Sequence, residues 1–262
     1  MSFLDQSERR RFLIDFLLAE RPADFASLSV PENEDSQRRL LRALMNVRPP
    51  VPIDEGFLAV QDEYLQAELR QKGVVDAEAL PEAEAGIALW QGDITRLKAD
   101  AVVNAANSAL LGCFAPCHGC IDNAIHTFAG VQLRLECAAL KKREHIAEER
   151  TGNARLTPAF NLPARFVLHT VGPIVGCCVT DEDRELLTSC YRSCLELAAQ
   201  NGLRSVAFCC ISTGEFHFPN EEAAVIALRT VRGFVKHHPG MKVIFNVFKE
   251  LDRKIYSRLL GC

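Results

Sequence analysis

The strongest constraint on this chain is a regular alternation of short apolar runs with longer helical patterns over its C-terminal part. The apolar runs lie at residues 87–90, 101–103, 166–171, 206–211 and 243–247. The helical patterns between and after them cover residues 121–145, 181–200, 219–237 and 250–260. Strands that alternate with helices form mostly parallel sheets covered by helices, so this part of the chain predicts an α/β fold.

The N-terminal part has a different pattern, in which apolar residues recur at helical spacing. They do so near residues 12–17, 40–45 and 57–69. Pro49, Pro50 and Pro52 separate the second segment from the third. The stretch 76–86 is poor in large apolar groups and predicts a linker. We therefore expect a helical N-terminal extension over residues 1–80 and an α/β domain over residues 81–262.

Composition and charge exclude several classes of protein. Among the 262 residues, 48% are hydrophobic and 24% charged, which is enough for an ordinary core and unlike a disordered chain. The formal net charge of -4 gives no overall basic field, so a nucleic-acid partner is not expected. No apolar run approaches the ~18 residues of a membrane span, and residues 1–20 lack the apolar core of a signal peptide. The odd count of 11 cysteines favours thiols and a cytoplasmic protein.

The loops after the strands are expected to carry the chemistry, because ligands of open α/β sheets bind at the carboxyl ends of the strands. One such loop is Ser212-Thr213-Gly214, which leaves an apolar strand and leads into a helix beginning near Pro219. Small residues before a helix N-terminus can bind an anion through free backbone N–H groups. The alternative is an ordinary turn between strand and helix. No Walker lysine follows, so the pattern does not indicate a nucleoside-triphosphate hydrolase of that class.

A second loop, residues 113–120, holds three cysteines and one histidine. Zinc prefers thiolate and imidazole ligands, and three protein ligands with an open fourth position are typical of catalytic sites. Cys113, His118 and Cys120 are the predicted ligands. Cys117 could replace Cys113, or complete a closed structural site, and the alternative is a set of unligated thiols.

Asp122 and His126 follow this loop four residues apart, and so share one face of the predicted helix. An acid beside a Lewis-acidic ion can orient or deprotonate water. Taken singly, Asp122 is more often a capping acid of a helix N-terminus. His126 is interpreted as a packing residue of the core.

Several motifs in a fixed order resemble the macrodomain family of ADP-ribose-binding α/β/α modules. They are Gly92-Asp93-Ile94-Thr95, the run from Ala101 to Asn107, the run from Ile121 to His126, Thr151-Gly152-Asn153-Ala154, the run from Leu162 to Pro173 and Ile211-Ser212-Thr213-Gly214. The resemblance implies a three-layer α/β/α fold with a mixed sheet. Ordinary hydrolytic macrodomains have a run of glycines where this chain has residues 113–120. In this loop the chain is similar to a zinc-dependent subfamily of macrodomains with an N-terminal helical extension. Members of that subfamily are encoded near sirtuin-type ADP-ribosyltransferases in some microbes.

The resemblance also implies roles for individual residues. Asp93, with Ile94 beside it, would recognise the adenine, and Phe248 would lie against its ring. The backbone amides of Ser212, Thr213, Gly214 and Glu215 would bind the diphosphate, with Phe216 beside the distal ribose. Asn107 would bind that ribose, and Asp122 would take the position of the acid that other hydrolytic macrodomains use there.

The activity implied is zinc-dependent removal of mono-ADP-ribose from side chains, with an acidic preference inferred from the subfamily. The partner would be a mono-ADP-ribosylated protein, and ADP-ribose the product. One alternative is a reader module that binds modified proteins without hydrolysis. Another is a hydrolase of small ADP-ribose derivatives.

Overall fold

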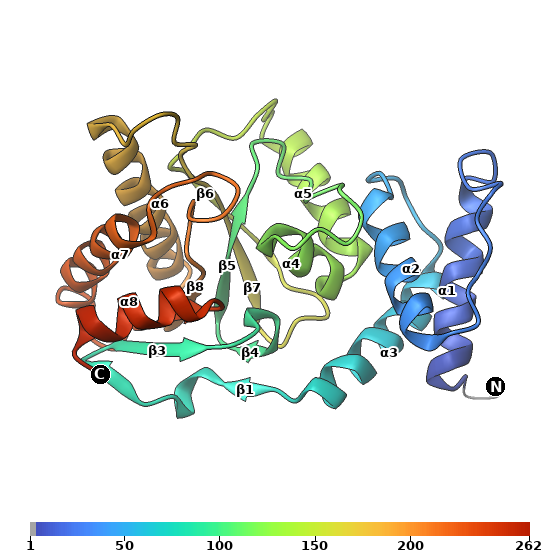
Figure 1. The fold of residues 1–262 in the computed structure, drawn as a ribbon, viewed down its shortest axis with the longest axis horizontal. Coiled ribbons are helices and arrows are strands. Elements are labelled where there is room, and N and C mark those ends of the chain that lie inside the picture. The colour runs from blue at the N-terminus through green and yellow to red at the C-terminus, as the bar shows by residue number, and fades with distance from the viewer. Residues whose placement is uncertain (1–3) are drawn as a thin grey trace.

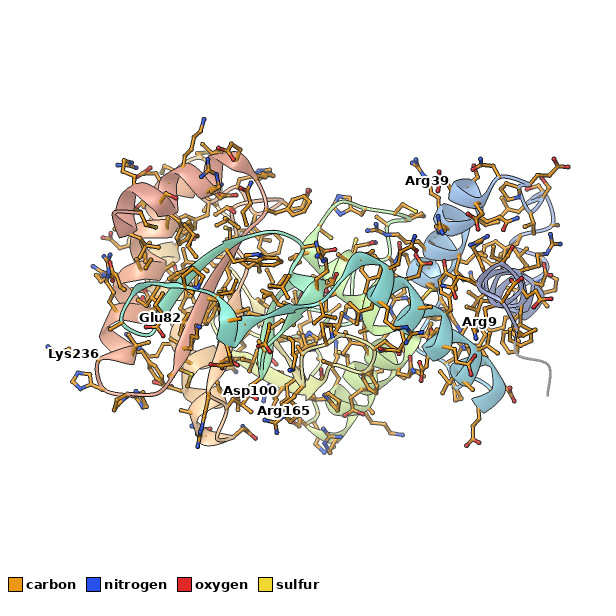
Figure 2. The ribbon with its side chains drawn as sticks, turned by 90° about the horizontal axis from the view of Figure 1, so that it is seen from below. Arg9, Arg39, Glu82, Asp100, Arg165 and Lys236 are labelled. Carbon is orange, nitrogen blue, oxygen red and sulfur yellow. The ribbon has the colours of Figure 1, made fainter. Side chains whose placement is uncertain are left out.

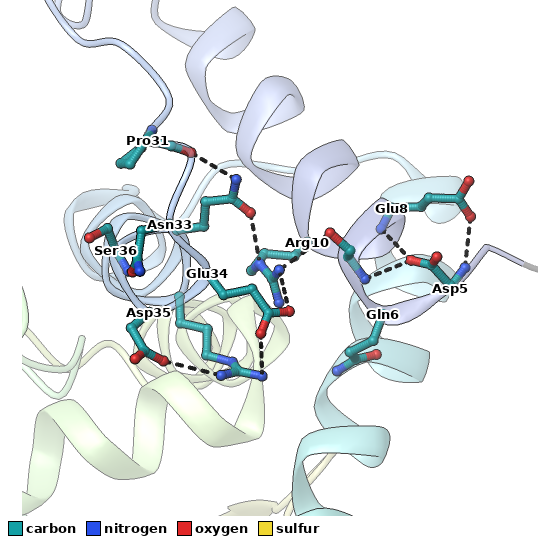
Figure 3. Close-up of polar contacts among 12 residues, drawn as sticks. Asp5, Gln6, Glu8, Arg10, Pro31, Asn33, Glu34, Asp35 and Ser36 are labelled. Atoms are coloured by element: carbon teal, nitrogen blue, oxygen red, sulfur yellow. Dashed lines mark hydrogen bonds and ion pairs between the residues drawn. The ribbon is translucent and has the colours of Figure 1, made fainter.

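The computed structural model describes residues 4–262, and its N-terminal part consists of three helices (Figure 1). They are α1 (Gln6–Glu20), α2 (Glu34–Val47) and α3 (Glu55–Lys72). Each begins at an Asp or Asn whose side chain accepts hydrogen bonds from the first turn; at α1, Asp5 and Glu8 form a reciprocal capping box (Figure 3). Three local capping signals therefore fix where these helices start.

The three helices share an apolar core built from Leu13, Ile14, Phe57 and their neighbours, and this core includes Val131 from the α/β part of the chain. The side chain of Arg10, on α1, is also fully buried. It donates to the carboxylate of Glu34 at 2.9 Å and to the side-chain oxygen of Gln37 at 3.0 Å, and so joins α1 to the start of α2 (Figure 3). The helical region is therefore packed against the α/β part through apolar surface.

The segment predicted to be a linker, residues 76–86, connects α3 to the α/β part and contains short strands. β1 (Val75–Asp76) pairs in parallel with β4 (Leu97–Lys98), and β2 (Glu82–Glu84) pairs antiparallel with β3 (Ile87–Gln91). β1, β2 and β4 are only two or three residues long, which is too short for a periodic apolar signal, and this explains why the sequence did not indicate them.

The main sheet has seven strands in the order β2-β3-β9-β8-β5-β7-β6. The five inner strands run parallel, and β2 and β6 are antiparallel edges, which makes the sheet mixed. The remaining strands are β5 (Ala101–Ala106), β6 (Ala154–Pro158), β7 (Phe166–Val171), β8 (Ser205–Phe208) and β9 (Lys242–Val247). The predicted α/β fold with a mixed sheet is confirmed.

Helices cover both sides of this sheet (Figure 1). α4 (Ile121–Ala129) and α5 (Val131–Arg143) lie on the side of the helical region. α6 (Asp181–Gln200), α7 (Asn220–Val235) and α8 (Glu250–Leu260) lie together on the other side. The single helix predicted over residues 121–145 is two helices, because Gly130 at their junction has φ 94°. Within residues 4–262, no helix is both long and apolar enough to cross a membrane.

Candidate active site

The sheet order brings the predicted site loops together. β3, β9, β8 and β5 are parallel neighbours, so their carboxyl ends meet at one edge of the sheet. The segments that follow them carry Asp93, Phe248, the Ser212–Phe216 loop and Asn107, in that spatial order. Neighbouring strands in a sheet therefore place in one line the residues predicted to bind adenine, the loop 212–216, called the anion loop below, and the residue predicted to bind the distal ribose.

The loop 212–216 has the geometry of an anion site. β8 ends at Phe208, three residues earlier than predicted, and Ser212 has φ 64°. The amide of Thr213, predicted to bind the diphosphate, donates instead to the carbonyl of Cys210, and the amides of His217 and Phe218 donate to the carbonyls of Gly214 and Ser212. Those of Gly214, Glu215 and Phe216 donate to no acceptor in the described part of the chain. Adjacent free N–H groups before the N-terminus of α7 favour a bound phosphate.

A neighbouring glycine sets the position of this loop. A Cβ added to Gly172 would lie 2.0 Å from the side-chain oxygen of Ser212. That hydroxyl is buried and has no hydrogen-bond partner among the described residues. The loop after β7 thus approaches the anion loop so closely that a larger residue does not fit at 172.

Residues 113–120, called the metal loop below, bring the three predicted ligands together. The ligand atoms of Cys113, His118 and Cys120 lie within 4.8 Å of one another, and each side chain is half-buried. Nδ1 of His118 is buried without a hydrogen-bond partner in residues 4–262. Two sulfurs and an unpartnered imidazole nitrogen form a donor set that suits zinc.

Cys117 does not join this group. Its backbone is left-handed, with φ 55°, and its thiol donates to the backbone carbonyl of Arg39 in α2 at 3.3 Å. The arrangement therefore has three convergent ligands from the protein, and Cys117 contacts α2 instead.

The metal loop meets the anion loop at one contact. Nε2 of His118 lies 3.6 Å from a carboxylate oxygen of Glu215. Ligating histidines commonly direct their second ring nitrogen toward a carboxylate, which fixes the ring orientation. Nδ1 of His118 is then the nitrogen left for a metal.

Asp122 is buried next to the metal loop, near the start of α4. Its two carboxylate oxygens accept from the side-chain amides of Asn104 at 2.8 Å and Asn107 at 3.2 Å. Burial raises the pKa of Asp122 to about 6, and the hydrogen bond from Asn104 opposes this rise. Asn107 also donates to the carbonyl of Gly112 at 3.1 Å, so it links Asp122 to the start of the metal loop. The structure thus places both predicted catalytic residues side by side.

A second cluster of potential ligands lies behind Asp122. The side chains of His126, Cys137 and His169 are buried with their ligand atoms within 4.8 Å of one another. His169 contacts Asn104 at 3.2 Å and Thr157 at 2.9 Å through its two ring nitrogens. Because both nitrogens are engaged, this cluster is better explained as a polar network that supports Asn104. His126 lies in the core, as interpreted from the sequence.

The residues predicted to bind adenine are Asp93, Ile94 and Phe248. The Asp93 carboxylate accepts from the backbone and hydroxyl of Thr95, at 3.0 and 2.6 Å. The Ile94 side chain is 1% exposed and belongs to the core, so only its backbone is left for a ligand. Phe248 is 74% exposed directly after β9, where its ring is free to stack.

A cavity of about 640 Å³ lies elsewhere, between α6 and α7, and none of the predicted site residues lines it.

Four polar residues that support the site were not predicted from the sequence: Asn104, His169, Arg42 and Asn46. Asn104 stands inside the Asn-Ala-Ala-Asn run, which could have indicated it. Arg42 and Asn46 lie on α2, far away in the chain, and gave no local signal.

Comparison with known proteins agrees with this architecture. Residues 103–227 match the Macro domain family. A protein-ADP-ribose hydrolase of Treponema medium is 53% identical over 263 residues, which cover 98% of this chain and 100% of the relative. A protein-ADP-ribose hydrolase of Staphylococcus aureus strain Mu50 is 47% identical over 256 residues, which cover 97% and 95%.

A solved Trypanosoma brucei macrodomain in complex with ADP-ribose is 35% identical, with a TM-score of 0.66. The match covers 84% of this chain and 95% of that one. The bacterial relatives include the N-terminal helices in their alignments, since they match nearly the whole chain. On its sequence, its sheet order and these relatives, the chain belongs to the macro domain family.

Proposed function

We propose that this protein is a zinc-dependent hydrolase that removes mono-ADP-ribose from acidic side chains of modified proteins. The observation that carries the proposal is the convergence of Cys113, His118 and Cys120 beside the Asp122–Asn107 pair. This group lies at the ribose end of an anion loop, where the scissile bond of a bound ADP-ribosyl ester would be. The names of the bacterial relatives support hydrolysis, and the Trypanosoma complex supports ADP-ribose as the ligand.

The chain's own residues divide the work along the ligand. The free amides of Gly214, Glu215 and Phe216 bind the diphosphate. The side-chain oxygen of Asn107, which has no partner among the described residues, accepts from a hydroxyl of the distal ribose. Asp122, held by Asn104 and Asn107, orients or activates the attacking water. Cys113, His118 and Cys120 would hold a zinc ion, which would supply Lewis acidity next to the scissile ester. Hydrolysis consumes one water and yields ADP-ribose and the free carboxylate.

The test is a time course of ADP-ribose release from a protein that carries a single ADP-ribose on a glutamate or aspartate. The same sample is analysed for zinc before and after chelation. We expect about one zinc per chain, loss of turnover with loss of zinc, and recovery when zinc is returned. His118→Ala should lose both the metal and the activity. Full activity in a zinc-free sample would contradict the proposal.

Two other functions are outcomes of the same experiment. Stable capture of the modified protein without release of ADP-ribose would identify a reader module. Turnover of acetylated or phosphorylated ADP-ribose, with none of the protein ester, would identify a hydrolase of small derivatives. A sirtuin-type ADP-ribosyltransferase is the proposed source of the modified protein, and activity on its product would support that pairing.

A further inference from the structure

We propose that α2 of the N-terminal helical region is part of the metal centre, with Arg42 and Asn46 as positioning residues that hold the metal loop in its ligating geometry. The inference rests on the proposed zinc site and adds a role for a region outside the macro domain match at residues 103–227.

Arg42 connects α2 to the metal loop at two points. Its guanidinium donates to the side-chain oxygen of Asn123 at 2.6 and 3.1 Å, and to the backbone carbonyl of His118 at 3.0 Å. Asn123 is fully buried, and its own amide donates to the carbonyl of Ala115 at 3.0 Å. One arginine therefore fixes the carbonyl of a predicted ligand directly and the middle of the loop through Asn123.

Asn46 holds the loop one residue earlier. Its side-chain oxygen accepts from the backbone N–H of Cys117 at 2.9 Å, and its amide donates to the hydroxyl of Thr127 at 2.9 Å. That hydroxyl donates to the carbonyl of Asn123 at 2.7 Å. The left-handed backbone of Cys117 is thus secured to α2 and, through Thr127, to α4.

α2 is itself anchored on the α/β part. Arg134 of α5 is buried and donates to the carbonyls of Met45 at 3.2 Å and Asn46 at 2.8 Å, and to that of Arg48. A cation at the carbonyl end of a helix satisfies groups that have no partner within the helix. The same guanidinium donates to the carbonyl of Leu111 at 2.6 Å and lies 4.1 Å from the ring centre of Phe114. Arg134 therefore ties the end of α2 to the start of the metal loop.

These contacts matter because the metal loop contains no helix or strand of its own. A loop free to sample many conformations would have to lose that freedom when it binds an ion. Groups that orient metal ligands without touching the ion typically contribute 10–100-fold in affinity. The guanidinium of Arg42 offers a planar pair of donors to the Asn123 oxygen, which a lysine cannot reproduce.

The experiment measures the zinc affinity of the full chain by competition with a chromophoric chelator. Arg42→Ala is expected to bind zinc on the order of 10–100-fold more weakly than the wild type, and Arg42→Lys to fall between the two. Arg39→Ala is the matched control, because Arg39 is an exposed arginine on the same helix (Figure 2). Its side chain has no hydrogen bond or ion pair among the described residues. Its backbone carbonyl, which accepts from the Cys117 thiol, is retained in Arg39→Ala, so this variant should bind zinc as the wild type does.

Two further measurements separate positioning from a general loss of structure. Urea unfolding of the zinc-free proteins should give similar free energies for Arg42→Lys and Arg39→Ala. Cobalt substituted for zinc should show weaker thiolate-to-metal and ligand-field bands in the Arg42 variants at equal cobalt concentration. Should Arg42→Ala fold poorly, Arg42→Lys carries the comparison.

The outcomes distinguish this inference from the proposed function. If the wild type binds zinc tightly and both Arg42 variants match it, α2 does not position the loop, and the proposed function stands. If the wild type shows no zinc binding that depends on His118, the zinc site itself is wrong, and both proposals fail.

Discussion

At the scale of single residues, the site depends on close approaches that leave no space for a larger side chain. Gly172 and Asp122 are the clearest cases, since one sets the distance between two loops and the other is a carboxylate enclosed by two amides. The resemblance to macrodomains indicated Asp122, whereas its place beside the metal loop alone left open a capping role. It gave no sign of the contact between Gly172 and Ser212, because that contact depends on how two loops meet.

Gly172→Ala is expected to weaken ADP-ribose binding by about tenfold or more, which corresponds to about 1.4 kcal/mol or more. The added Cβ would collide with the side-chain oxygen of Ser212 and displace the anion loop. Titration calorimetry with ADP-ribose measures the effect. Gly176→Ala is the control, because a Cβ there meets no atom within 4 Å. Equal affinities for the two variants would contradict this account of the loop.

Asp122→Ala is expected to lower turnover of an acid-linked substrate by about 100-fold or more, the range for a group that acts on the attacking water. Its affinity for ADP-ribose should change little, because the anion loop and the adenine residues are untouched. Single-turnover rates and calorimetry measure the two effects separately. A loss of binding as large as the loss of rate would assign Asp122 to substrate positioning.

At the scale of elements, the predictions succeeded where a segment has a strong apolar period and failed at edges and breaks. The strand 166–171 and the helix 250–260 coincide with β7 and α8. β6 was missed because it is a short antiparallel edge strand, whose alternation of apolar and polar residues covers only four positions before Pro158. The break between α4 and α5 was missed because one glycine at positive φ interrupts a continuous apolar pattern.

That break makes a prediction about stability. Gly130→Ala should lower the free energy of unfolding by about 1–3 kcal/mol, because φ 94° is strained for any residue with a Cβ. Urea denaturation measures the change. Gly233→Ala is the comparison: it lies in α7 with no atom within 4 Å of an added Cβ, and it should raise stability by up to about 1 kcal/mol. A neutral Gly130→Ala would show that the junction relaxes without cost.

At the scale of the whole molecule, the buried histidines couple stability to pH. Burial lowers the pKa of His169 to about 4 from its ordinary value of 6.5, and it faces Cys137, Asn104 and Thr157. Burial also lowers the pKa of the neighbouring His126. As pH falls below 6.5, His169 becomes protonated in the unfolded chain but stays neutral in the folded protein. The free energy of unfolding therefore falls between pH 6.5 and 4.

For His169 alone this loss is about 3 kcal/mol, from 1.36 kcal/mol for each unit of pKa. Over this pH range we expect the free energy of unfolding of the zinc-free wild type to fall more than that of His169→Asn, because the asparagine side chain does not titrate. The exposed His237→Asn should follow the wild-type profile. Parallel profiles for the wild type and His169→Asn would mean that the pKa of His169 is the same in the folded and the unfolded protein.

The order of the sheet also has a consequence for the size of molecule that fits. Four adjacent strands, β3, β9, β8 and β5, span three interstrand distances of about 4.8 Å, or about 14 Å in all. A compound with a base at one end and a sugar at the other must be about that long to touch the residues predicted to bind adenine and the residue predicted to bind the distal ribose at once. A single nucleotide would leave one end vacant. The distance between the two ends of the site is fixed by the backbone hydrogen bonds of the sheet. Replacing a side chain therefore does not change the length of ligand that fits.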